Sequence, residues 1–203
     1  MGSRAGPRHN PPVILIAVML LALITVPLAG GRLIRIADVS VRWGWAILIA
    51  IGLQIFVISF LPDRFGELPE WLHVLSYFFA ALFILANIRV PGMFLIGLGG
   101  LSNLVAILAN DGVMPASEAA LRTAGIIQEA EGFANSAAVE DPKLLFLGDV
   151  FAIPDSVPIL DNVFSVGDIL IAAGLFILIH GICGSRLVPA RFRRSDALPE
   201  DVA

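Results

Sequence analysis

The sequence predicts an all-α integral membrane protein: a five-helix transmembrane bundle with a structured extracytoplasmic loop. Hydrophobic residues make up 58% of the 203-residue chain and charged residues only 15%, which is far more apolar than an ordinary soluble domain. Five apolar segments are also present, each close to the ~20 residues that cross ~30 Å of hydrocarbon. They lie at about residues 12–29, 44–61, 72–88, 92–110 and 165–184.

The first apolar segment follows the positively charged stretch MGSRAGPRHNPP and ends in PLAGG. A cleaved signal peptide is therefore the alternative to a retained helix, although the cleavage pattern is poor. In a bilayer the backbone must satisfy its own hydrogen bonds, so we expect every retained segment to be helical. Residues 1–185 are predicted to form a single transmembrane domain, with an outer loop at 111–164.

The distribution of basic residues predicts the orientation of this bundle, because Lys and Arg favour cytoplasmic helix ends. With five spans, one side would hold Arg32, Arg35, Arg42, Arg89, Arg186, Arg191, Arg193 and Arg194. The other side would hold Arg4, Arg8, Arg64, Arg122 and Lys143. We therefore expect a cytoplasmic C-terminus, followed by a disordered tail at 186–203 that is basic and then acidic. The N-terminal arginines disagree with this assignment.

The connection at residues 111–164 is expected to be acidic and partly folded. It holds nine acidic and two basic residues, and an unstructured loop of this length would be unusual. SEAALRTAGIIQEAE begins with Ser117 in a pattern like a capping box, which predicts a short amphipathic helix on the membrane surface. KLLFLGDVFAIPDSVPILDNVF contains two prolines and predicts an extended hydrophobic strap that dips to the interface.

Small and amide residues share one face of the fourth apolar segment. Asn103 and Asn110 are seven residues apart, beside a row formed by Gly92, Gly99 and Ala106. The last segment repeats this spacing, at Gly167, Gly174 and Gly181. Small residues allow helices to approach closely, so we expect these two helices to pair along the two rows. Helix packing is the favoured role for both asparagines.

Asp168 is the most informative single residue, because a carboxylate at the start of a membrane helix is costly unless it is paired or hydrated. In FSVGD, Ser165 is a candidate N-cap and Asp168 lies three positions later, where an acid complements the helix dipole. Capping is favoured, with catalysis or ligand binding as the alternative. Asp149 is the potential catalytic partner, since two close carboxylates can share a proton and activate water.

These residues define the predicted site, a polar cluster at the outer rim of the bundle. The turn NDGVMP belongs to it, because Asn110 can end the preceding helix and Gly112 can adopt a left-handed conformation. The predicted members of the cluster are Asn103, Asn110, Asp111, Gly112, Met114, Pro115, Ser165, Gly167 and Asp168.

The sequence predicts no metal site and no cofactor. HExxH, HxxxH and phosphate-binding GxxxxGK[ST] patterns are missing, as is a serine nucleophile elbow. Cys183 is the single cysteine, so no intrachain disulfide can form. A net charge of −4 with 13 Lys and Arg residues predicts no broad basic face of the kind expected of a nucleic-acid binder, so we expect no nucleic-acid partner.

Four stretches together resemble a bacterial family of multi-pass membrane proteins, the domain of unknown function 5317. They are GGRLIRIADVSVRWGWAILIAIGLQ, VPGMFLIGLGGLSNLVAILANDGVMPAS, LLFLGDVFAIP and FSVGDILIAAG. The resemblance covers roughly residues 14–182 and implies a multi-pass protein of the bacterial plasma membrane, with no activity attached. The family pattern Asn-Gly-Gly-Arg-Met-Pro is replaced here by NDGVMP, and the missing arginine weakens any anion-binding role for this turn.

A shorter stretch, GDVFAIPDSVPILDNVFSVGDILIAAG, is similar to part of lipoprotein signal peptidase, an intramembrane aspartic protease. The resemblance covers about thirty residues and aligns Asp168 with the second catalytic aspartate of that enzyme. The Asn-x-x-Asp-Arg motif that carries the first catalytic aspartate is absent, and Asp149 falls at a neighbouring position.

Three functions remain open from the sequence. The favoured one is a non-enzymatic membrane module that contacts protein or lipid partners, among them the bilayer, another membrane protein or a second copy of the chain. The second is an aspartate-dependent hydrolase that uses Asp149 and Asp168. The third is a small transporter whose path is lined by Asn103, Asn110 and Asp168, although no inverted repeat is evident.

Overall fold

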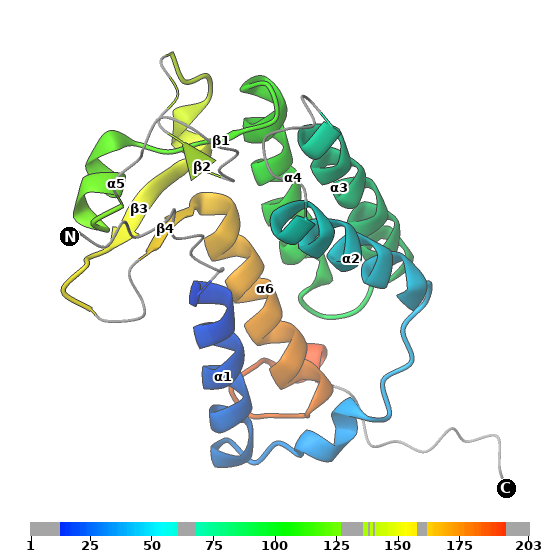
Figure 1. The fold of residues 1–203 in the computed structure, drawn as a ribbon. Helices are drawn as coiled ribbons and strands as arrows, with labels where there is room; N and C mark the ends of the chain where they lie inside the picture. Colours follow the sequence, from blue (N-terminus) through cyan, green and yellow to red (C-terminus); the bar gives the residue numbers. More distant parts are fainter. Residues whose placement is uncertain are drawn as a thin grey trace, which may run out of the picture.

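The computed structural model describes residues 13–60, 68–126, 136–137, 139, 141–157 and 162–193. This part of the chain contains six α-helices and two small two-stranded sheets (Figure 1). The helices are α1 (Val13–Leu28), α2 (Gly44–Phe60), α3 (Leu68–Ala86), α4 (Met93–Ala109), α5 (Glu118–Thr123) and α6 (Val166–Ile182). The strands are β1 (Met114–Pro115), β2 (Ser136–Ala137), β3 (Asp149–Ile153) and β4 (Asn162–Ser165). Three short 3-10 helices are η1 (Leu33–Ile36), η3 (Leu145–Leu147) and η4 (Ala190–Phe192).

Five of the six α-helices coincide with the five apolar segments of the sequence, but the predicted transmembrane bundle is wrong. Within the described residues, no helix combines the length and the apolar character needed to cross a membrane. Helices α1, α2, α4 and α6 have 16 or 17 residues. At 1.5 Å per residue they are about 24–26 Å long, short of the ~30 Å hydrocarbon layer. The predicted multi-pass location in the plasma membrane, and the orientation predicted for the bundle, are therefore wrong as well.

The apolar composition misled the prediction because the apolar segments were taken to be long enough to cross a membrane, and some of them include residues that form turns. Helix α1 ends before Gly30, which has a φ of 75°, and Gly92, with a φ of 90°, precedes α4. Helix α3 is the longest, with 19 residues, but Pro69 and His73 lie in its first two turns. Helices α1, α2, α4 and α6 are one to three residues shorter than their apolar segments, and α3 is two residues longer than its segment.

Helices α4 and α6 form the closest pair in the fold, and they pair along the predicted rows of small residues. An added Cβ at Gly92 would meet the carbonyl oxygen of Gly174, and one at Gly99 would meet that of Gly167. The two rows run antiparallel, so backbone touches backbone and no larger side chain fits between them. Gly181, the third member of the second row, lies against the Phe192 carbonyl and the Pro91 ring instead.

Helix α6 lies between α1 and a group of three other helices (Figure 1). Helix α1 packs against it on one side, where the Ala22, Val26, Ile179 and Cys183 side chains form a buried apolar cluster. Helices α2, α3 and α4 are grouped on its other side (Figure 1). The burial of Cys183 raises the pKa of its thiol, while the nearby Arg35 opposes that shift.

A small α/β layer covers the N-terminal end of α6 (Figure 1). Strands β3 and β4 form an antiparallel hairpin in which Phe151 pairs with Phe164, and the two rings stack with centroids 5.4 Å apart. Strands β1 and β2 form a parallel pair. The predicted hydrophobic strap is therefore extended over residues 149–153, but it pairs with residues 162–165 of the same chain.

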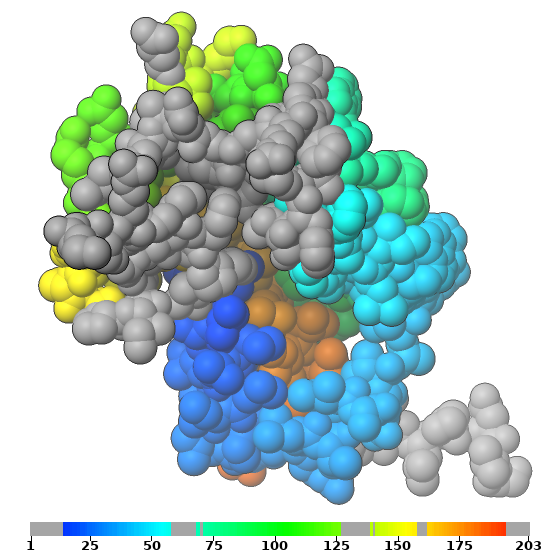
Figure 2. Space-filling model, in the orientation of Figure 1, coloured from blue at the N-terminus to red at the C-terminus, as the bar shows by residue number. Residues whose placement is uncertain are grey.

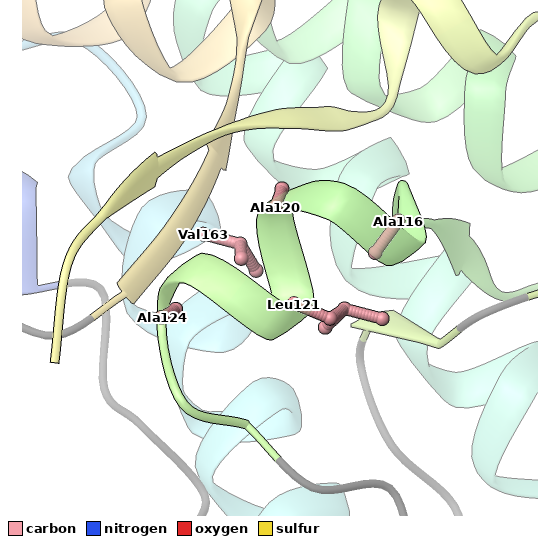
Figure 3. Close-up of a cluster of buried hydrophobic side chains, with 5 residues drawn as sticks. All are labelled: Ala116, Ala120, Leu121, Ala124 and Val163. Carbon is pink, nitrogen blue, oxygen red and sulfur yellow. The ribbon is translucent and has the colours of Figure 1, made fainter.

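The predicted amphipathic helix exists as α5 and packs on this hairpin. Ser117 is its N-cap and accepts a hydrogen bond from the Ala120 amide, as its position in the sequence predicts. Its apolar side faces β4 in a cluster that Figure 3 shows, formed by Ala116, Ala120, Leu121, Ala124 and Val163. Its six residues are a shorter helix than the sequence predicts, and residues 127–131 lie outside the described part of the chain.

Candidate functional site

The candidate site begins at the first turn of α6, where Ser165 and Asp168 form a reciprocal capping box. The Ser165 hydroxyl oxygen accepts from the Asp168 amide at 3.0 Å, and the Ser165 amide donates to the Asp168 Oδ2 at 2.9 Å. Both orphan amides of the helix start are satisfied, and the carboxylate lies where it complements the helix dipole. The capping role predicted for Asp168 is thus present.

Asn103 joins this capping box from α4. Its Nδ2 donates to Asp168 Oδ1 at 2.9 Å, and its Oδ1 accepts from the Ser165 hydroxyl at 2.8 Å. Asn103 is 7% exposed and Ser165 is fully buried, so the bond between these two side chains lies out of water and its loss would leave polar groups without partners. Gly167 makes the contact possible, because a Cβ at that position would overlap the Asn103 Oδ1.

Asp149 lies on the other side of Ser165. It begins β3 and is the register partner of Ser165 in the hairpin, and its side chain is buried. Its carbonyl oxygen accepts from the Ser117 amide at 3.0 Å, which ties the hairpin to the start of α5. The structure therefore brings the two aspartates of the sequence hypothesis to either side of one serine.

Tyr77 is the residue of this region that sequence reasoning missed. It projects from α3 and packs against the cluster of Ala106, Ile107 and Met114. Burial raises the pKa of its phenol, and the negative charges of Asp168 and Asp149 raise that pKa further. Tyr77 is the one tyrosine of the chain. A tyrosine inside an apolar run needs a polar environment for its hydroxyl group, and this requirement is the signal in the sequence that could have identified it.

The NDGVMP turn forms a second polar set, which lies at the C-terminal end of α4. Asn110 ends the helix, and its Nδ2 donates to the carbonyls of Ala106 at 2.7 Å and Lys143 at 2.8 Å. Its Oδ1 accepts from the Lys143 amide at 2.9 Å. The asparagine thus pairs with the Lys143 backbone as a strand would, and it holds the loop before η3 against the helix.

The remaining predicted members of the cluster belong to this turn. Asp111 and Gly112 both have left-handed φ values, 55° and 93°, as expected of a helix C-cap turn. Met114 is buried against α4, and the Pro115 carbonyl lies against Gly148. The predicted rim cluster is therefore two separate sets: one around Ser165 and one around Asn110.

The first set has a structural role, because its hydrogen bonds join α4 to the start of α6. Each oxygen of the Asp168 carboxylate accepts one hydrogen bond from the protein. In the described ranges, no three His, Cys, Asp or Glu side chains gather in a way that could hold a metal ion.

Comparison with known proteins identifies the family. A family model described as a family of unknown function, DUF5317, matches residues 38–180. The chain belongs to DUF5317. The match confirms the resemblance noted in the sequence and covers a narrower span than the residues 14–182 expected from it. The matched residues of this DUF5317 member include both polar sets. They also include the whole of α4 and all but the last two residues of α6.

No curated protein matches the chain, and no solved structure matches it. The partial resemblance to lipoprotein signal peptidase gains no support from these comparisons.

Proposed function

We propose that this DUF5317 protein is a non-enzymatic module that contacts lipid through the exposed apolar faces of its helices. The observation that carries the proposal is the number of large apolar side chains that the fold leaves uncovered. Eight of them, each more than half exposed, come from five different helices: Ile24, Leu28, Ile34, Leu48, Trp71, Leu85, Phe94 and Leu108. Leu28 is 80% exposed, Leu48 70% and Leu85 68%. Extensive exposed apolar surface marks sites of lipid or protein contact.

The interior of the bundle supports a role without catalysis. Asn103, Ser165 and Asp168 form hydrogen bonds with one another, and these bonds hold α4, α6 and the hairpin together. A transporter would leave Asn103 open to a path. Both amide atoms of Asn103 are instead bonded within the protein, which supports a packing role.

Flotation of the full chain with phosphatidylcholine vesicles in a density gradient tests the proposal. The wild type should float with the vesicles. Leu48→Gln and Leu85→Gln should each weaken the association by about tenfold or more, because burial of a whole Leu side chain in an apolar phase contributes about 1.5–3 kcal/mol. Neither change should alter the free energy of unfolding by more than about 0.5 kcal/mol, because both side chains are exposed.

Glu118→Gln and Arg122→Gln provide the matched control, since both side chains are exposed on α5 and pair with each other at 2.9 Å. These variants should float like the wild type. A chain that stays at the bottom of the gradient with all vesicles contradicts the proposal. So does a chain that self-associates without lipid and loses that self-association in Leu48→Gln, because its partner would then be a second copy.

A further inference from the structure

One end of the helical bundle collects most of the positive charge of the described chain. This end, called the arginine end below, is formed by the C-terminus of α1, η1, the start of α2, the turn between α3 and α4, and the segment after α6. Its arginines are Arg32, Arg35, Arg42, Arg89, Arg186, Arg191 and Arg193. Asp38 is the one carboxylate of this end within the described residues. The acidic residues of the described loop lie with α5 and the hairpin, at the other end of α6.

Backbone contacts bring these distant segments together, so the clustering is part of the fold. The Arg32 amide donates to the Cys183 carbonyl at 2.9 Å, and the Arg186 amide donates to the Ala29 carbonyl at 3.0 Å. Asn87 bonds both the amide and the carbonyl of Arg42, at 2.9 and 2.8 Å. Residues separated by up to about 150 positions in the chain are thereby held at one surface.

The arginines of this surface differ in whether their side chains already bond to other groups of the protein. Arg193 is half-buried and donates to the carbonyls of Val188 and Arg186. Arg32, Arg42, Arg89 and Arg186 are exposed. In the described part of the chain, the side chains of these four form no ion pair. Their charge is available to an external anion.

Exposed apolar side chains are interleaved with these arginines. Ile34 is 65% exposed, Leu187 54% and Trp43 49%, and each of the three is within two residues of an arginine in the sequence. Figure 2 shows α1 and the segment with η1 adjoining at this end of the molecule, in two shades of blue. Trp43 also has a φ of 54°, a left-handed conformation that is rare for a bulky residue. The fold therefore holds an indole outward at some cost to the backbone.

We propose that the arginine end binds the headgroups of anionic phospholipids, with Trp43, Ile34 and Leu187 inserted at the headgroup level. This inference rests on the proposed lipid contact and names its chemistry. Arginine interleaved with tryptophan and aliphatic side chains is the pattern of a surface that lies at a membrane interface. A nucleic acid would meet the same arginines, but its phosphates give no partner to Ile34 and Leu187. An anionic lipid surface matches both the charges and the apolar side chains.

Sedimentation with vesicles of two compositions tests the inference, with the full chain in every sample. Binding to vesicles that contain phosphatidylglycerol should exceed binding to pure phosphatidylcholine vesicles, and added salt should reduce the difference. Arg32→Gln, Arg42→Gln, Arg89→Gln and Arg186→Gln should each lower the partition coefficient for anionic vesicles by about fivefold, which corresponds to about 1 kcal/mol per arginine. Arg122→Gln and Lys143→Gln, at the other end of the fold, should have no such effect.

Trp43→Asn separates binding from folding. Asparagine tolerates the left-handed conformation of this position, so the unfolding midpoint should be unchanged or higher while vesicle binding falls. Equal binding to both vesicle types, unaffected by the four arginine changes, overturns the inference and leaves the proposed lipid contact standing. Failure to bind either vesicle type overturns both. Equal loss of binding in the arginine variants and in Arg122→Gln also overturns the inference, because the effect would then follow net charge alone.

Discussion

Replacement of Asp168 by asparagine tests the capping role of this carboxylate most directly. The wild-type carboxylate accepts one bond from Asn103 Nδ2 and one from the Ser165 amide, both at 2.9 Å. Asparagine has one oxygen, so its NH₂ group must face one of these two donors. Asn103 cannot rotate freely to compensate, because its own oxygen accepts from the Ser165 hydroxyl.

The expected loss follows from these contacts. One hydrogen bond to a charged acceptor contributes about 1.5–3 kcal/mol, and the negative charge at the helix start contributes about 0.3–1 kcal/mol. Asp168→Asn should therefore lower the free energy of unfolding by about 2–3 kcal/mol. Urea denaturation followed by tryptophan fluorescence measures it. A loss below about 0.5 kcal/mol, the usual range of a surface substitution, would refute the reasoning.

Asp111→Asn is the matched control, because Asp111 is exposed and its left-handed conformation suits asparagine equally well. This variant should unfold at the same urea concentration as the wild type. A double-mutant cycle between Asn103→Ala and Asp168→Ala adds a second check. The two changes should be non-additive by about 0.5–3 kcal/mol, as expected of groups in direct contact.

Three further predictions follow from the packing and the buried ionisable groups. Gly99→Ala should destabilise the fold, because its Cβ would meet the α6 backbone, whereas Gly100→Ala, with nothing within 4 Å, should be neutral or stabilising; urea midpoints compare the two. Burial and two carboxylates raise the pKa of Tyr77, so absorbance in an alkaline titration should show this single tyrosine ionising above its ordinary value of 10.0 while the protein is folded. Burial lowers the pKa of His180, so the unfolded chain takes up the proton first and stability should fall as the pH drops through 6.5; His180→Gln should lose part of that dependence in pH-dependent unfolding.

Local signals in the sequence predicted much of the helical structure. The five apolar runs located five helices, because burial of apolar residues and helix formation coincide along them. Ser117 and Ser165 marked two helix starts through their side-chain chemistry. The seven-residue spacing of the small residues predicted the pairing of α4 with α6, because that spacing places them on one face. These features depend on residues close together in the chain.

The features that the sequence did not predict depend on distant residues or on absolute length. Asn110 meets the Lys143 backbone 33 positions away, and no local pattern indicates that contact. The hairpin was missed because the prolines between its strands favoured an irregular strap over paired strands. The transmembrane bundle was wrong because the apolar runs were taken to be long enough to cross a membrane, whereas α1, α2, α4 and α6 have only 16 or 17 residues. Tyr77 was missed because its carboxylate neighbours come from two other elements.

The central claim, that the exposed apolar helical faces lie against lipid, is tested most directly by fluorescence quenching with brominated acyl chains. The three tryptophans, Trp43, Trp45 and Trp71, are all 49% exposed or more. Single-tryptophan variants mixed with vesicles of brominated and ordinary phospholipid would report each position separately. The account predicts strong quenching at Trp71 on α3 and weaker quenching at Trp43, which lies at the headgroup level. Equal fluorescence in brominated and ordinary vesicles at both positions would contradict it.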